Sequence, residues 1–234
     1  HGENTTVISY RANKTGRKHI TLEVRPLVAF RDYHSTTHEN SALNAQVEFS
    51  AGQATLQPYA DLPRLHFAHN ACDATTTGHW YRNFEYSEEQ ARGLDFREDL
   101  FNPLALTFTM KSRSQAFIIA STEAHAIADV APMQRRELKR RQAVIAAANP
   151  PTPFTQQLVT AADQFIVARG EQKTIIAGYP WFSDWGRDTM IALPGLTLAT
   201  GRADIAKSIL LEFAQHVDQG MLPNRFPDAG EAPE

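Results

Sequence analysis

The chain has 234 residues, of which 42% are hydrophobic and 21% are charged, and its formal net charge is −3. This composition is typical of a globular protein with a sizeable core, and the weak negative charge gives no reason to expect binding to nucleic acid or to an anionic membrane. The single cysteine, Cys72, excludes an intrachain disulfide and favours a reducing, cytoplasmic location. No apolar run approaches the roughly 18 residues of a membrane-spanning helix.

Residues 1–130 show the alternation of apolar and polar side chains that is typical of β-strands. In one stretch, Ile20, Leu22 and Val24 face one side, and the polar residues between them face the other. Many short strands separated by loops rich in Asn, Thr, Gly, Asp and Pro predict an antiparallel β-sandwich. The expected strands are residues 5–11, 19–24, 47–51, 64–68, 80–86, 104–110 and 115–121.

Histidines of this region are the only candidates for a metal site. The nine histidines of the chain lack the spacing of a set of metal ligands, although His34 and His38, or His66 and His69, could be paired ligands. Neither pair is joined by the further ligands that a zinc site needs, and satisfied surface histidines are far commoner. We therefore expect no bound metal.

A basic stretch at residues 135–141 follows, and it leads to a double proline at 150–151. Acidic and basic residues alternate here, while Leu138 and Val144 lie on one side, which favours a solvated linker helix at 131–151. The alternative is a patch that binds anions or nucleic acid.

After Pro151 the apolar period changes from 2 to 3.6 residues, which indicates helices. The apolar face running from Phe154 to Ile166 predicts a first helix, with Thr152 as its N-cap and Gly170 just past its end. Two further helices are predicted at residues 188–200, with a kink at Pro194, and at residues 204–219.

Residues 178–202 read GYPWFSDWGRDTMIALPGLTLATGR and place aromatic residues and an Arg-Asp pair before an apolar helix. Sugars present flat C–H faces that pack on aromatic rings, and Arg187 and Asp188 can fix vicinal hydroxyls by charge-assisted hydrogen bonds. The segment therefore predicts the rim of a sugar-binding cavity. Alternatively, the aromatic residues belong to the core, and Asp188 only stabilises a helix N-terminus.

This motif resembles the signature of the glycogen debranching enzyme family, in its amylo-α-1,6-glucosidase part. Three further stretches extend the resemblance along almost the whole chain: PLVAFRDYH at 26–34, WYRNFEYSEEQARGLDFREDLFNP at 80–103 and GMLPNRFPDAG at 220–230. The resemblance implies a β + α multidomain protein. An antiparallel supersandwich at 1–130 and a linker helix would precede the first helices of an (α/α)6 barrel at 152–234. It also implies that the chain, which starts without Met and stops in a loop, is a fragment of a longer protein.

Hydrolysis of an α-1,6 branch needs two carboxyl groups, and the resemblance implies an inverting enzyme in which they lie roughly 6.5–9.5 Å apart. In related barrels both groups lie on later loops, so the acid and base are expected downstream of Glu234. A direct acid role for Asp184, Asp188, Asp228 or Glu231 is the alternative. Asn224 and Arg225 form a second rim loop, which either bonds sugar hydroxyls or supports the first loop. The substrate-binding residues implied are Trp181, Phe182, Trp185, Arg187, Asp188, Asn224 and Arg225.

We therefore expect a glycoside hydrolase that removes α-1,6-linked glucose from glycogen, limit dextrin or branched malto-oligosaccharide, with no cofactor, no nucleic acid and no membrane partner. Rival interpretations are another (α/α)6 glycosidase of the glucoamylase, trehalase or glycoside phosphorylase type, and a non-catalytic glycan-binding module. The family implies an interdomain structural role for the charged segment 88–99. Apolar faces around Leu158 and Phe213 would lack partners, so we also expect the truncated chain to self-associate.

Overall fold

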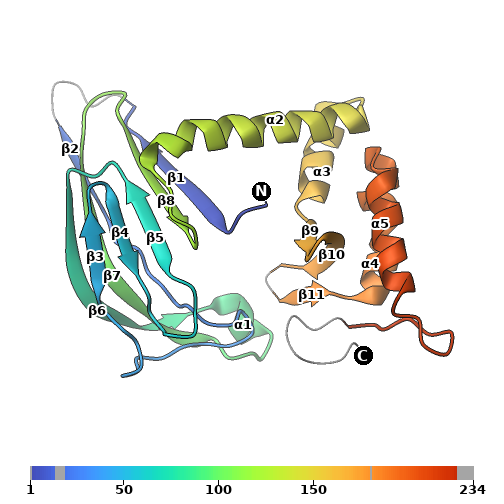
Figure 1. The fold of residues 1–234 in the computed structure, drawn as a ribbon, viewed down its shortest axis with the longest axis horizontal. Coiled ribbons are helices and arrows are strands. Elements are labelled where there is room, and N and C mark those ends of the chain that lie inside the picture. Colours follow the sequence, from blue (N-terminus) through green and yellow to red (C-terminus); the bar gives the residue numbers. More distant parts are fainter. Residues whose placement is uncertain (1, 14–18, 180, 226–234) are drawn as a thin grey trace. The chain divides into compact units, whose positions relative to one another are not determined.

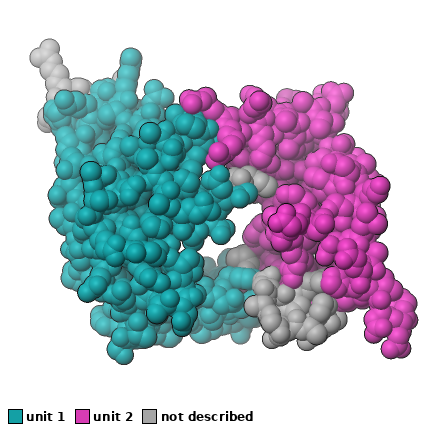
Figure 2. All heavy atoms as spheres, in the orientation of Figure 1, with its two compact units in different colours: residues 1–134 teal, residues 135–234 magenta. Residues whose placement is uncertain are grey.

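The structure is a computed structural model, and it describes residues 2–13, 19–179 and 181–225 of the chain. The chain divides into two compact units, residues 1–134 and residues 135–234, which we call the β unit and the helical unit (Figure 2).

Two antiparallel sheets form the β unit (Figure 1). In the described residues, one sheet has the strand order β1-β8-β5-β4-β3 and the other has the order β2-β7-β6. The elements are β1 (Thr5–Arg11), β2 (Ile20–Val24), β3 (Val47–Ser50), β4 (Gln53–Leu56), β5 (Leu65–His69), β6 (Asp73–Glu85), α1 (Ser87–Ala91), β7 (Arg97–Met110) and β8 (Gln115–Ser121).

One hydrophobic core joins the facing sides of these two sheets. Leu56, Phe67 and Ile118 come from the five-stranded sheet, whereas Phe101 and Leu106 come from β7, and all five side chains are buried. Because successive side chains of a strand point to opposite faces, this core uses alternate positions of each strand. The expected antiparallel sandwich is therefore present in the β unit.

The opposite face of β5 and β8 is covered by the start of a long helix. The short helix η1 (Ile127–Asp129) leads into α2 (Val130–Ala148), and Val130 is buried against Ala68 and Ile119. This helix covers most of the predicted linker. Among the described residues, no helix combines the length and the apolarity needed to cross a membrane.

In the helical unit, α2 is followed by α3 (Pro153–Asp163), and Thr152 is the N-cap of α3 as predicted. The Thr152 hydroxyl accepts a hydrogen bond from the backbone N–H of Thr155 at 3.1 Å. The prediction that this helix extends to Gly170 is wrong, because the chain leaves the helix at Asp163 and enters a strand.

An antiparallel sheet replaces the end of the predicted helix. Its strands are β9 (Ile166–Arg169), β10 (Gln172–Gly178) and β11 (Phe182–Asp184), in the order β11-β10-β9. Only two residues connect β9 to β10, and the first of them, Gly170, has a φ of 54°. Tight hairpins of this kind need such a positive φ, and β10 is rich in the β-branched residues that favour strands.

Two further helices pack on this sheet. They are α4 (Gly186–Leu196), which contains Pro194 and is followed by η2 (Leu198–Thr200), and α5 (Ala203–Ala214). Their core includes Leu193, Ile209 and Phe213 together with Ile175 of β10. Helix α4 starts two residues before the predicted position, and α5 ends five residues before it. The (α/α)6 barrel stays a prediction.

Candidate functional site

The predicted sugar-binding rim lies at the β10–β11 hairpin and at the start of α4. Gly178 pairs with Phe182, so that Trp181 lies beside the turn of the hairpin. The Phe182 side chain is 46% exposed, and its ring contacts the Trp185 ring edge-on at a centroid distance of 6.2 Å. Trp181 and Trp185 are half-buried. The hairpin carries Trp181 and Phe182, Trp185 is the N-cap of α4, and Phe182 has the most exposed side chain of the three.

The second predicted rim loop is joined to this segment by its backbone and by Asn224. The Gly186 N–H donates to the Asn224 carbonyl at 2.9 Å, and the Arg187 N–H donates to Asn224 Oδ1 at 3.1 Å. Trp185 also forms an isolated antiparallel bridge with Arg225. The structure therefore brings the two segments together through Asn224, and the alternative of a hydrogen bond from Asn224 to a sugar hydroxyl stays a prediction.

Glycine is required at the joint between the two loops. A Cβ atom on Gly186 would lie 2.3 Å from the carbonyl oxygen of Pro223, closer than non-bonded atoms approach. The helix start can therefore lie against the second loop only if residue 186 has no side chain.

Arg187 and Asp188 lie in the first turn of α4, with 3.5 Å between Arg187 Nη2 and Asp188 Oδ2. Their side chains are 68% and 42% exposed, so both have polar groups available to a ligand in water. The position of Asp188 also fits the capping alternative, since a carboxylate stabilises a helix N-terminus.

Asp184, one of the alternative candidates for a direct acid role, is a buried carboxylate. It is the last residue of β11, its side chain is 2% exposed, and Arg169 donates to its Oδ1 at 2.8 Å. The Thr174 hydroxyl donates to the other oxygen at 3.1 Å. Asp184 is therefore held in an ion pair below the rim. The other two candidate acids, Asp228 and Glu231, lie outside the described residues.

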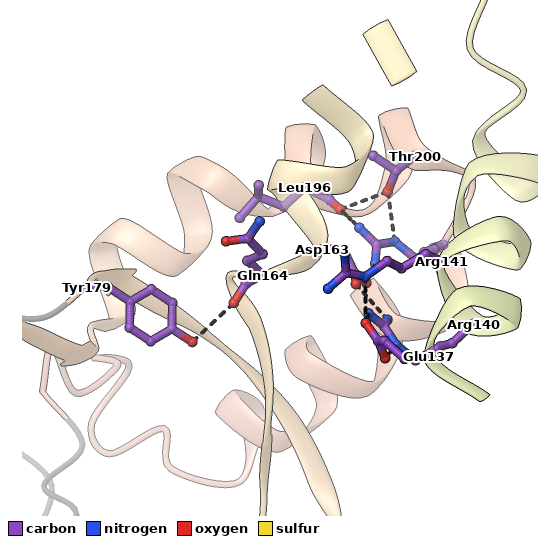
Figure 3. Close-up of polar contacts among 9 residues, drawn as sticks. Glu137, Arg140, Arg141, Asp163, Gln164, Tyr179, Leu196 and Thr200 are labelled. Atoms are coloured by element: carbon purple, nitrogen blue, oxygen red, sulfur yellow. Dashed lines mark hydrogen bonds and ion pairs between the residues drawn. The ribbon is translucent and has the colours of Figure 1, made fainter. Parts of the chain in front are cut away.

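A buried polar network, which the sequence analysis did not detect, supports the helices behind the rim (Figure 3). Asp163 accepts from Arg202 at 2.7 Å and from Arg140 at 2.6 Å. Arg202 also donates to the Leu196 carbonyl and to the Thr200 hydroxyl, both at 2.9 Å. The motif residue Arg202 is therefore structural. The sequence carried no signal of this network, because the burial of Arg202 follows from tertiary packing.

Residues Glu137 and Arg140 show why the basic stretch is not a free cationic patch. Arg140 donates to both oxygens of Glu137 at 2.9 and 3.0 Å, and Arg141 donates to the same carboxylate at 2.7 Å. The hydrogen bond from Arg140, with smaller contributions from Arg141, lowers the pKa of Glu137 to about 2 against the opposing effect of burial. These paired charges agree with the predicted solvated linker helix.

In the β unit, Glu98 belongs to β7 rather than to a charged loop, and its side chain is 1% exposed. Arg31 binds it with two hydrogen bonds of 2.9 Å, and the Tyr86 hydroxyl also donates to it. Burial raises the pKa of Glu98, but the hydrogen bonds from Arg31 and Tyr86 outweigh it, so that the net pKa is lowered. Glu98 therefore orders a loop of its own unit.

The predicted histidine pairs do not gather a set of metal ligands. Among the described residues, no group of three or more His, Cys, Asp and Glu side chains could hold an ion. His34 instead contacts Asp32 at 3.2 Å, and His66 contacts the Thr55 hydroxyl at 3.1 Å.

Comparison with known proteins gives two family matches. The family described as glycogen debranching enzyme N terminal matches residues 1–117, and the family described as amylo-alpha-1,6-glucosidase matches residues 160–234. A protein of Saccharomyces cerevisiae named glycogen debranching enzyme is 40% identical over 83 residues, which cover 33% of this chain and 5% of that protein. The chain thus spans a small part of this curated relative. No solved structure matches. Because the N-terminal family model and the amylo-alpha-1,6-glucosidase family model match successive parts of the chain, the chain belongs to the glycogen debranching enzyme family.

Proposed function

We propose that this chain supplies the substrate-binding rim of an amylo-α-1,6-glucosidase, a glycoside hydrolase that removes α-1,6-linked glucose at glycogen branch points. The observation that carries the proposal is the attachment of Asn224 to the start of α4, through hydrogen bonds to Gly186 and Arg187. This attachment holds an aromatic hairpin and an exposed Arg-Asp pair at one place. Aromatic faces beside a charged pair suit a pyranose, which is flat and apolar on its faces and polar at its edge.

In this proposal, Trp181, Phe182 and Trp185 form walls that pack against glucose. Arg187 donates to sugar hydroxyls and Asp188 accepts from them, which makes Asp188 more than a helix-capping charge. Of the second loop, Asn224 holds the first loop in place, and Arg225 lies beside Trp185 at the rim. The matches to named glycogen debranching families support the choice of an α-glucan substrate.

We propose further that the reaction proceeds with inversion, and that its acid and base lie outside the described rim. Such a reaction needs two carboxyl groups roughly 6.5–9.5 Å apart, with a water molecule between them. Asp184 does not suit either role, because its oxygens are engaged by Arg169 and Thr174. The 234-residue chain alone should therefore release no glucose from a phosphorylase-trimmed limit dextrin.

The test compares Asp188→Asn with Asp204→Asn in the same chain. Asp204 is the acidic residue in the first turn of α5, so both changes remove a helix N-terminal carboxylate. Each should lower the free energy of unfolding by about 0.3–1 kcal/mol. Only Asp188→Asn should weaken maltoheptaose binding in isothermal titration calorimetry, by about tenfold, because it also loses a charge-assisted hydrogen bond to the sugar.

Equal maltoheptaose affinity in the two variants would leave only the capping role of Asp188 and remove the sugar-binding role. Glucose release by the chain alone would instead contradict the absence of the acid and base. A third outcome is that the rim binds maltoheptaose as proposed, while forms of the protein that are longer than this chain also fail to hydrolyse limit dextrin. A glycan-binding module would then be the better description.

A further inference from the structure

Strand β6 of the β unit is interrupted by two irregularities. Its register with β7 shifts between Thr76 and His79 and again between Tyr81 and Phe84. Near these shifts, Gly78 has a φ of 65° and Asn83 has a φ of 60°. Bulges bend a strand and redirect its side chains, and they often do so beside functional sites. Residues 79–82, with the sequence HWYR, lie between the two irregularities on a strand at the edge of its sheet.

A buried carboxylate, that of Asp99, binds two segments that lie on either side of this region, one at the second irregularity of β6 and the other at residue 39. Asp99 of β7 is 8% exposed, and its Oδ1 accepts from the Asn83 N–H at 2.9 Å. Its Oδ2 accepts from the Glu39 N–H at 3.0 Å. One side chain therefore holds a loop near residue 39 beside the second bulge of β6. The result is an ion pair at the surface between Glu39 and Arg82.

The space between these two segments is an open groove of about 390 Å³. This volume lies within the usual range of small-molecule sites, about 300–1,000 Å³. Trp80 is held by the core, since its ring lies 5.4 Å from that of Phe101, while Tyr81 is 37% exposed. The residues that line the groove are Glu39, Gly78, His79, Trp80, Tyr81 and Arg82.

We propose that this groove is a second glycan-binding site, which takes a segment of an unbranched α-glucan chain. Successive side chains of a strand point to opposite faces, so Trp80 packs on the core beside the groove, and the exposed Tyr81 ring offers apolar surface to a pyranose face. Arg82 and Glu39 are 58% and 43% exposed, so they can donate to and accept from sugar hydroxyls without leaving a buried charge. An anionic ligand is disfavoured because Glu39 lies at the same wall.

The proposal takes its ligand class from the proposed function, but it involves none of the rim residues. It would let the β unit hold a glucan chain independently of the aromatic hairpin of the helical unit. A site for an unbranched chain and a site for a branch glucose would make separate contributions to the affinity for a polymer.

Tryptophan fluorescence tests the groove separately from the rim, because the chain has three tryptophans. In the double variant Trp181→Phe/Trp185→Phe, Trp80 is the remaining reporter, and two walls of the proposed rim are altered. Titration with maltoheptaose should still give a saturable change. Adding Arg82→Gln should weaken the apparent affinity about tenfold through the loss of a charged hydrogen bond.

Arg97→Gln is the matched control, because Arg97 and Glu85 form a comparable exposed ion pair outside the groove. This change should leave the Trp80 titration unaltered. Absence of a saturable Trp80 signal, or equal weakening by both changes, would overturn the groove. An equal response to cellohexaose would overturn its assignment to α-glucans.

Native gel electrophoresis through glycogen gives a second measurement that does not depend on the tryptophan changes. Arg82→Gln in the otherwise unaltered chain should reduce the retardation by glycogen, and Arg97→Gln should not. Loss of maltoheptaose binding on Asp188→Asn without any effect of Arg82→Gln would overturn the groove and leave the rim. An effect of Arg82→Gln alone would support the groove and contradict the rim.

Discussion

Asp163 and Arg202 form a buried ion pair across 39 positions of the chain, with 2.7 Å between Asp163 Oδ1 and Arg202 Nη1. Asp163 is the last residue of α3, and Arg202 is the N-cap residue of α5. The second oxygen of Asp163 binds Arg140 of α2 at 2.6 Å. A single carboxylate therefore connects three helices of the helical unit, and the rim rests on the same framework.

Arg202→Met should destabilise the helical unit by about 1–3 kcal/mol, because Asp163 keeps only Arg140 as a cationic partner and the buried Leu196 carbonyl loses its donor from Arg202. Arg141→Met is the control, since Arg141 is 56% exposed and pairs with Glu137 at the surface. That change should cost about 0–1 kcal/mol. Urea unfolding followed by circular dichroism measures both, and similar losses would show that the Arg202 pair is not a principal support.

Gly186→Ala should separate the two rim loops. The added Cβ would meet the Pro223 carbonyl oxygen at 2.3 Å, so the loops must shift and the bond from Gly186 to Asn224 must lengthen. We expect a loss of about 1–3 kcal/mol in stability together with weaker maltoheptaose binding.

Gly195→Ala serves as the control, because in the part of the chain that the structure describes no side chain or other segment lies within 4 Å of a Cβ built on this residue of α4. It should raise stability by about 0.5–1 kcal/mol, since alanine favours a helix more than glycine does. Differential scanning calorimetry distinguishes the two, and identical melting temperatures would contradict the close contact at Gly186.

The strands of the β unit were largely predictable from the alternation of side chains. Residues 5–11 and 115–121 form β1 and β8 with the predicted bounds. β4 was missed although it pairs with β3, which has the same length and was predicted, and although Gly52, with a φ of 71°, lies in the two-residue turn between them. Short strands give too few alternations for a pattern, so their turns are the better signal.

Helical periodicity was misleading at the end of α3, because Phe165 and Ile166 continue the apolar spacing of the helix by chance. Both residues pack on the core of the helical unit, but Ile166 is the first residue of β9 and Phe165 directly precedes this strand. Asn224 contacts the start of α4, and the sugar-binding rim that the sequence predicted at these segments stays a prediction. The ion pairs of Asp163 and Asp184 were not predictable, since each joins residues distant in sequence through tertiary packing.

Asp184→Asn tests whether this carboxylate supports the rim. The change weakens the hydrogen bond from Arg169 to residue 184, and it removes the negative charge that compensates the Arg169 guanidinium. We expect a loss of about 1–3 kcal/mol in stability, with a lower maltoheptaose affinity as a consequence. Thr174→Val, which removes the 3.1 Å hydrogen bond alone, should cost about 1 kcal/mol. An unchanged melting temperature in Asp184→Asn would show that the ion pair contributes nothing.

His69 should make the stability of the β unit depend on pH. Its side chain is buried, and among the described residues neither ring nitrogen has a hydrogen-bond partner. Burial lowers the pKa of His69 below its usual value of 6.5. The unfolded chain therefore binds a proton near pH 6.5 that the folded chain does not take up, so stability falls as pH decreases from 6.5 toward the lowered pKa.

His69→Leu should reduce this slope and raise the free energy of unfolding by about 1–3 kcal/mol, because it removes buried polar atoms that lack partners. Some slope should remain, since burial, followed by the charge of Arg64, also lowers the pKa of His66. His38→Leu is the control, because the side chain of His38 is 62% exposed. Urea unfolding at pH 5.5 and 7.5 decides the matter, since the same difference between the two pH values in all three proteins would contradict the role of His69.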